Sequence, residues 1–200
     1  MMADAPHTAT PSLSQAAAGN LRYIRATMDA SGAFTCVPGA GIVLVGIIGV
    51  LAGLAVTLGP FAESWLLFWL GAAAIAAPVG AALLARKAAS SGTTLASGVG
   101  RRFLFALLPG FVAAAFLTAA LVQAGLLTVV PAAWLLLYGA SVSAAGALSV
   151  LAVRLLGMTC MALGALSLAA PASFAQVALL AGFGLAHIGF GGWIWRQHGG

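Results

Sequence analysis

The amino-acid sequence predicts an all-α integral membrane protein, a bundle of about six transmembrane helices preceded by a short amphipathic helix. Of the 200 residues, 62% are apolar and only 6% are charged, whereas soluble domains contain roughly 25% charged residues. The apolar residues form long runs, and a bilayer core of about 30 Å requires roughly 20 of them per helix. These runs lack the alternation of polar and apolar residues typical of membrane barrels, so we expect helices.

The residues before the first long apolar run divide into two parts. Residues 1–11 are small and polar and contain proline, which predicts a disordered tail. Residues 12–32 carry apolar side chains at helical intervals, and Ser12 and Gln15 have the spacing of a capping box. We therefore expect an amphipathic helix that lies on the inner membrane surface or packs against the bundle.

The transmembrane domain is predicted to cover residues 40–195. Short connections containing Pro or Gly join several of its apolar segments, which favours hairpins of antiparallel helices. The fifth segment is short for a full crossing and follows an apolar link, so a re-entrant or mismatched pair is an alternative. The predicted spans are 40–58, 65–85, 103–123, 132–149, 155–170 and 174–194.

The basic residues predict the orientation. If the chain crosses the membrane six times from an inner N-terminus, all eight Lys and Arg residues fall on the inner side, where cytoplasmic connections collect them. We therefore expect both termini in the cytoplasm. Four of these residues, which set topology or contact anionic lipid, share the second connection: Arg86, Lys87, Arg101 and Arg102. The tryptophans agree, because they favour membrane interfaces and fall near predicted span ends: Trp65, Trp69 and Trp134 outside, Trp193 and Trp195 inside.

Pairs of small residues predict close contacts between helices. Lipid gives helices no hydrophobic reason to associate, so small side chains that let backbones approach become informative. Such pairs occur in the first, fourth and sixth predicted spans, and they would pack inside one bundle or between two copies. They are Gly49 with Gly53, Gly139 with Ser143, and Gly182 with Ala186.

A candidate intramembrane pocket surrounds His187. This is the only readily titratable side chain well inside a predicted span, where a polar group is costly unless it finds a partner. Gly184 and Gly191 flank it on the same helix and open a shallow groove, while Pro78 and Pro109 kink two other spans at a similar depth. His187 is then either a proton carrier or ligand contact, or a neutral residue hydrogen-bonded to a neighbouring helix.

Two further polar residues are candidates at the outer face. Glu63 is the only acid beyond the N-terminal region and stands just before the second span, where it caps the helix or contacts a cation. Tyr138 is expected towards the outer side, as an interfacial anchor or the partner in an interhelical hydrogen bond.

Patterns typical of enzymes are not found in this sequence. It has no carboxylate pair, no Cys–His combination in one region and no HExxH, and its inner loop lacks the Lys-Ser/Thr of a phosphate-binding loop. Cys36 and Cys160 do not have metal-ligand spacing. We therefore expect no catalytic activity, no cofactor, no bound metal and no nucleic-acid partner.

Three stretches resemble a group of uncharacterised bacterial polytopic membrane proteins. They are RYIRATMDASGAFTCVPGAGIVLVG at residues 22–46, WLLLYGASVSAAGALSV at 134–150 and AGFGLAHIGFG at 181–191. The resemblance covers most of the chain from Arg22 onward and implies a bacterial inner membrane. It carries no established activity and no functional residue.

Three classes of function are compatible with these features. The leading hypothesis is a non-enzymatic accessory or interaction subunit, whose partners are the lipid bilayer and either another membrane protein or further copies of itself. The alternative is a small transporter or channel-like protein that uses the pocket near His187. A membrane-embedded enzyme is third, because the sequence lacks clustered acids or histidines.

Overall fold

The computed structural model describes residues 17, 19–22, 34–59, 61–92, 94–96 and 98–198. The chain divides into two units, residues 1–32 and 33–200. In the first unit, Ala17 and the residues 19–22 are helical. The predicted tail and most of the predicted amphipathic helix lie outside the described residues.

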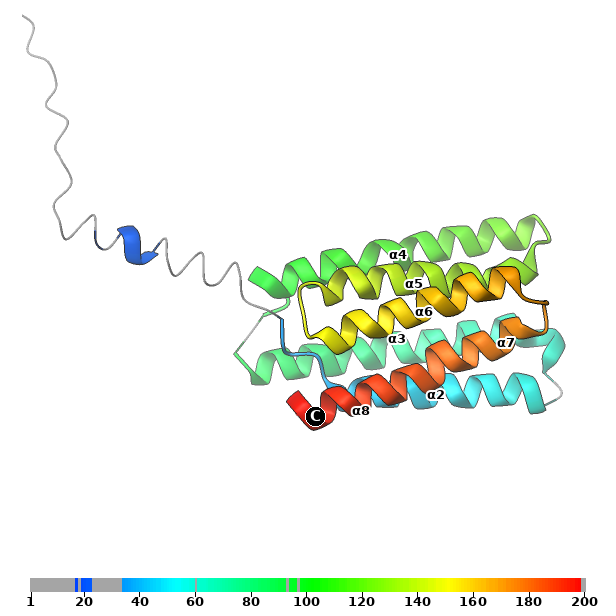
Figure 1. Ribbon diagram of the computed structural model, residues 1–200, viewed down its shortest axis with the longest axis horizontal. Coiled ribbons are helices and arrows are strands. Elements are labelled where there is room, and N and C mark those ends of the chain that lie inside the picture. The colour runs from blue at the N-terminus through cyan, green and yellow to red at the C-terminus, as the bar shows by residue number, and fades with distance from the viewer. Residues whose placement is uncertain are drawn as a thin grey trace, which may run out of the picture. The chain divides into compact units, whose positions relative to one another are not determined.

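The second unit confirms the predicted fold class (Figure 1). Six helical segments are long and apolar enough to cross a membrane, so this is a multi-pass membrane protein. Short 3-10 turns precede two of them, η1 (Ala62–Ser64) and η2 (Leu127–Val129). The helices are α2 (Gly39–Leu58), α3 (Trp65–Ser90), α4 (Gly98–Gln123), α5 (Val130–Gly146), α6 (Leu151–Ala169), and a sixth span made of α7 (Phe174–Leu179), the π-helical segment η3 (Leu180–Ala186) and α8 (His187–His198).

The fifth span is a continuous helix rather than a short segment. Helix α6 has 19 residues because the apolar link that precedes the predicted start is already helical from Leu151. It forms a tight hairpin with α5, in which the two backbones meet at glycines. A Cβ atom built on Gly139 would lie 2.6 Å from the carbonyl oxygen of Gly157. The predicted small-residue pair of the fourth span therefore packs against α6.

The helices fall into two groups (Figure 1). Helix α5 packs against α4 and α6, whereas α2 packs against α3, η3 and α8. Contacts of α6 with η3 and of α7 with both α2 and α5 join the groups. Helices α3 and α4 therefore lie at the periphery. Helix α3 packs mainly against α2, and α4 packs mainly against α5.

Helix α2 and the sixth span approach each other through glycines. A Cβ on Gly49 would lie 2.4 Å from the carbonyl oxygen of Phe183, and one on Gly46 would lie 2.8 Å from the backbone nitrogen of Ile188. Larger side chains at these positions would force the backbones apart. Of the two possible uses of the Gly49 and Gly53 pair, the structure has the one within a single bundle.

The segment that leads into α2 is fastened to the rest of the bundle. The backbone N–H of Phe34 donates to the carbonyl oxygen of Leu148 at 2.7 Å, and the hydroxyl of Ser149 donates to the carbonyl oxygen of Phe34 at 2.6 Å. The ring of Phe34 packs on Phe103 of α4 with centroids 4.8 Å apart. These contacts tie the start of α2 to the link between α5 and α6.

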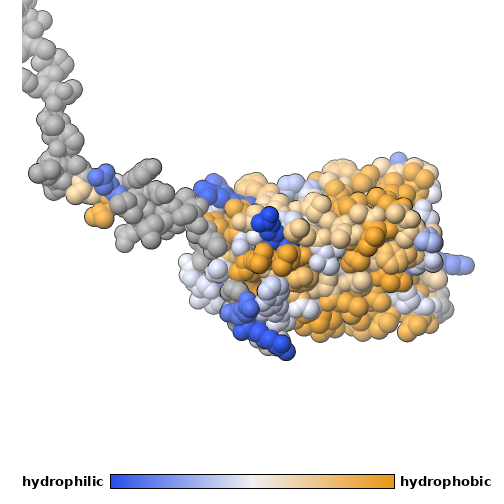
Figure 2. All heavy atoms as spheres, viewed as in Figure 1, coloured by the Kyte–Doolittle hydropathy of each residue, from blue (hydrophilic) through white to orange (hydrophobic). Residues whose placement is uncertain are grey.

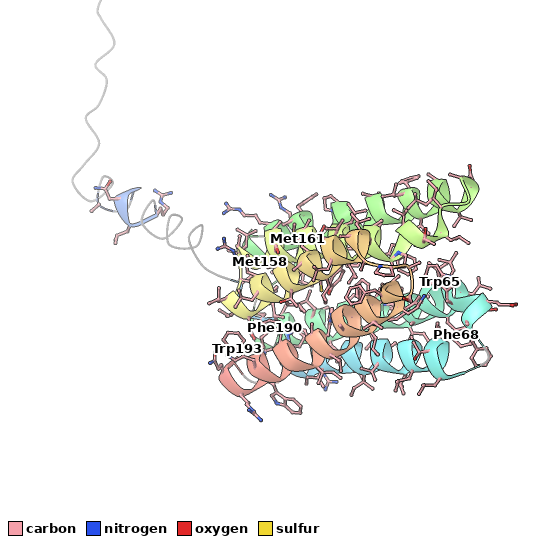
Figure 3. The ribbon with its side chains drawn as sticks, turned by 45° about the vertical axis from the view of Figure 1, so that its right-hand side comes forward. Trp65, Phe68, Met158, Met161, Phe190 and Trp193 are labelled. Carbon is pink, nitrogen blue, oxygen red and sulfur yellow. The ribbon has the colours of Figure 1, made fainter. Side chains whose placement is uncertain are left out.

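The surface of the second unit has the polarity of a membrane protein. Figure 2 shows apolar residues over the middle of the visible face and hydrophilic ones gathered towards one end. The described basic residues of this unit stand at or near the ends of α3, α4, α6 and α8 that meet there. Trp65 and Trp193 lie towards opposite ends (Figure 3). Trp69, predicted at an interface, is only 4% exposed and faces the protein interior.

Candidate functional site

His187 is buried near the middle of the bundle, at the point where the sixth span changes from a π-helix to an α-helix. Its side chain is 2% exposed, and Ser141 is the only other buried polar residue among the described ones. The π-helical segment ends at Ala186, directly before this histidine. Such segments are rare and occur often at functional sites, which makes His187 the first candidate.

Both ring nitrogens of His187 have hydrogen-bond partners. Nδ1 lies 2.8 Å from the carbonyl oxygen of Gly182, which can only accept, so Nδ1 carries the hydrogen. In a neutral ring Nε2 is then an acceptor, and the hydroxyl of Tyr138 donates to it at 2.5 Å. The two bonds fix the tautomer and orientation of the imidazole and connect the sixth span to α5.

Aromatic rings surround the His187–Tyr138 pair. Phe183 packs edge-on against Tyr138 with centroids 5.0 Å apart, and Phe111 of α4 does so at 5.6 Å. Trp69 of α3 approaches Phe183 at 6.1 Å. Each pair has the separation of favourable ring contacts. The cluster thus brings α3, α4 and α5 to the sixth span at one level.

Two more polar contacts support this region. The indole N–H of Trp69 donates to the side-chain carbonyl oxygen of Gln176 at 3.0 Å. The Cys160 thiol lies 3.9 Å from the carbonyl oxygen of Gly182, as a weak second donor to the atom that His187 binds. Cys36 and Cys160 are free and buried.

The predicted pocket residues do not meet in one place. Gly184 and Gly191 face α2: a Cβ on the first would lie 3.1 Å from the backbone nitrogen of Val50, and one on the second 2.7 Å from that of Val43. Helix α2 therefore fills the groove predicted beside His187. Pro78 and Pro109 lie in α3 and α4 with exposed side chains.

The two predicted outer-face residues are in different surroundings. Glu63 is exposed in η1, at the end of the bundle opposite the basic residues. Tyr138 lies near the middle of the 17-residue α5, and its ring faces inward to His187 rather than outward. Of the two roles predicted for Tyr138, its contacts correspond to the interhelical hydrogen bond.

The predicted basic set lies at the opposite end. Arg86 and Lys87 are in the last turns of α3, and Arg101 and Arg102 are in the first turns of α4. The three arginines are exposed and Lys87 is half-buried. Their position at helix ends fits either use predicted for them, because both topology and anionic lipid act at the membrane surface.

An apolar groove between α2 and α3 lies outside the predicted set. Its volume is about 580 Å³. It is lined by the α2 residues Ile48, Leu51, Ala52 and Ala55 and the α3 residues Leu67, Phe68, Gly71, Ala72 and Ile75. His187 and Tyr138 are not among these residues.

These features define the chemistry that the described residues offer. They include no group of three or more His, Cys, Asp or Glu side chains that could hold a metal ion. The His187–Tyr138 pair can exchange a proton along its hydrogen bond, and the groove can take an apolar ligand. No family model, no curated protein and no solved structure matches this chain.

Sequence reasoning missed Trp69, Phe183, Phe111 and the groove. One signal for the His187–Tyr138 pair was present: two polar rings isolated in apolar spans each need a partner inside the bilayer. The other rings with hydrogen-bonding groups in the predicted spans are tryptophans, which only donate, so His187 carries the one ring nitrogen there that can accept from the Tyr138 hydroxyl.

Proposed function

We propose that this chain is a non-enzymatic membrane protein that works by binding a component of the membrane, as an accessory or interaction subunit. The observation that carries the proposal is the exposure of α3 and α4. Each has 26 residues, yet only Trp69 and Ala88 are buried in α3 and only Gly100 and Phe103 in α4. Two long apolar helices thus keep most of their surface for lipid or for a partner protein.

The surroundings of His187 favour binding over transport. A transporter that used His187 would need access to its ring, whereas this side chain is only 2% exposed. Both ring nitrogens of His187 are engaged within the protein. The most polar group of the interior is thus used in joining helices.

We also propose that the protein resides in a bacterial inner membrane with both termini in the cytoplasm. The orientation is supported by Arg86, Arg101, Arg154 and Arg196, which stand near one end of the bundle, while Glu63 stands at the other. Alkaline phosphatase, which is active only in the periplasm, should be inactive when fused after Lys87 and active after Glu63. The reverse pattern would contradict the orientation.

Purification in a mild detergent tests the binding function. We expect a membrane protein or a defined lipid to remain bound through washing at constant stoichiometry and to be identified by mass spectrometry. A chain that carries neither, and that catalyses solute flux when reconstituted in vesicles, would contradict an accessory role.

A second candidate is supported by one observation, the π-helical segment beside the buried His187–Tyr138 hydrogen bond. In this alternative the pair carries a proton during transport, since histidine can change its charge near neutral pH. Proton flux into vesicles that contain the protein, abolished in His187→Phe while the fold is retained, would support it. Equal flux in His187→Phe and the wild type, or wild-type flux no greater than that of empty vesicles, would reject it.

A further inference from the structure

The groove between α2 and α3 has a floor of small residues and a rim of large ones. Ala52 is 8% exposed at the floor, and the rim residues Leu51 and Leu67 are 62% and 70% exposed. A Cβ built on Gly71 would have no atom within 4 Å, so the space above this glycine is empty of protein. Inside a bilayer such a space must be filled by something apolar.

The dimensions of the groove fit the hydrocarbon chains of a lipid rather than a helix. Its α3 wall runs from Leu67 to Ile75, or about 12 Å at 1.5 Å per residue, nearly half of a bilayer core about 30 Å thick. Spread over that length, a volume of about 580 Å³ gives a cross-section of roughly 50 Å². A helix with side chains, about 10–12 Å in diameter, is too wide.

The connection nearest the Leu67 end of the groove carries a negative charge. Glu63 lies in η1, within the short link between α2 and α3, the two helices that form the groove, and it is four residues before Leu67. Glu63 is the only acid among the described residues. Beside it, the rings of Phe61 and Phe68 stack with centroids 4.4 Å apart, and Figure 3 shows Phe68 at the same end as Trp65.

The charge at the Glu63 end of the bundle determines which lipid headgroup would be favoured there. The connections at this end, residues 59–64, 124–129 and 170–173, contain no Lys or Arg. An anionic headgroup would therefore meet a carboxylate without a compensating cation, whereas an ammonium group would meet an opposite charge.

We propose that this groove is a phospholipid site: it holds the acyl chains of one lipid whose ammonium headgroup, as in phosphatidylethanolamine, contacts the carboxylate of Glu63. The lipid belongs to the leaflet at the end opposite the basic residues. This site rests on the proposed binding function and gives it a ligand class.

Native mass spectrometry of the full chain in detergent tests the site, with added phosphatidylethanolamine or phosphatidylglycerol of identical acyl chains. The wild type should bind one phosphatidylethanolamine with about fivefold preference, because an exposed ion pair contributes modestly. Gly71→Phe, which occupies the groove, should weaken binding of this lipid about tenfold or more. Gly189→Phe in α8 is the matched control, because a Cβ there also has no atom within 4 Å, and it should bind like the wild type.

The headgroup contact has its own variant. Glu63→Gln should remove the preference for phosphatidylethanolamine, because it weakens binding of this lipid and strengthens binding of phosphatidylglycerol. Equal binding of both lipids by the wild type, or Gly71→Phe binding as tightly as Gly189→Phe, would overturn the lipid site while the broader binding function stands. A wild-type chain that retains neither lipid nor a protein partner would overturn both. A stable dimer that Gly71→Phe dissociates would assign the groove to a second copy instead.

Discussion

Helix α2 makes two different contacts with its neighbours. Towards the sixth span it presents Gly46 and Gly49, whose backbones nearly touch those of Ile188 and Phe183. Towards α3 it presents Leu51 and other apolar side chains that border an open groove. The face towards the sixth span is closed by protein, whereas the face towards α3 is open to the membrane beside the groove.

The difference shows how a chain of apolar residues specifies contacts in lipid. Hydrophobicity is the same on both faces, so it cannot decide which helices meet. Glycine decides which helices meet, because only a residue without a side chain lets two helix backbones come into direct contact. Where α3 offers Gly71 without a matching glycine on α2, the helices stay apart and a space remains.

The largest effect is expected on the closed face. Gly49→Leu would drive a side chain into the carbonyl oxygen of Phe183, 2.4 Å from the Cβ position, and overpacking of this kind costs about 3 kcal/mol or more. We expect a large fall in thermal stability in detergent, or failure to accumulate in the membrane. Gly189→Leu is the control that should behave as wild type. Unchanged stability of Gly49→Leu would contradict the close approach.

A smaller loss is expected at the interior pair. His187→Phe removes both hydrogen bonds and leaves the Tyr138 hydroxyl buried without its partner, which costs about 1–3 kcal/mol. Tyr138→Phe should cost less, and adding it to His187→Phe should cause little further loss. Chemical unfolding of the two single variants and the double variant measures this coupling. Strictly additive losses would show that the pair does not interact.

A still smaller loss of stability is expected when the contact between α3 and the sixth span is broken. Trp69→Phe keeps an aromatic ring but removes the donor to Gln176, with an expected loss of about 1 kcal/mol. Gln176→Leu should give a similar loss, and the double variant should not lose twice as much. Stabilities equal to the wild type in both single variants would indicate that α3 is not held by this bond.

A large side chain should be tolerated in the groove between α2 and α3, although it is not tolerated between α2 and the sixth span. Gly71→Leu meets no atom within 4 Å, so its stability should stay within about 0.5 kcal/mol of the wild type. The same substitution at two glycines, Gly49 and Gly71, thus separates the two faces. A loss at Gly71 as large as that at Gly49 would mean that the groove is closed in the membrane.

The helices could be predicted from the sequence because their signal is local. A run of apolar residues requires no partner to identify it, and the predicted spans differ from the observed helices mainly at their ends, as at Leu151 of α6. The small-residue pairs also indicated real contacts, since Gly49 and Gly139 are both at helix crossings.

The site was harder to predict because it depends on which faces meet. Depth along each helix grouped His187 with Pro78 and Pro109, but the exposed prolines show that depth does not fix direction. Tyr138 was assigned to the outer side, although the ring faces inward to His187. The π-helical segment and the groove arise from packing between helices, which a linear pattern of apolar residues does not encode.

Photolabelling from within the bilayer tests the central claim most directly, namely that α2 is closed by protein on one face and open to lipid along the groove on the other. The purified chain would be reconstituted with a phospholipid that carries a photoreactive acyl chain, and mass spectrometry would locate the labelled residues. The account predicts strong labelling at Leu51, Leu67 and Ile75, and none at Gly46 and Gly49. Labelling on the glycine face of α2, or its absence from the groove while other exposed apolar residues are labelled, would contradict it.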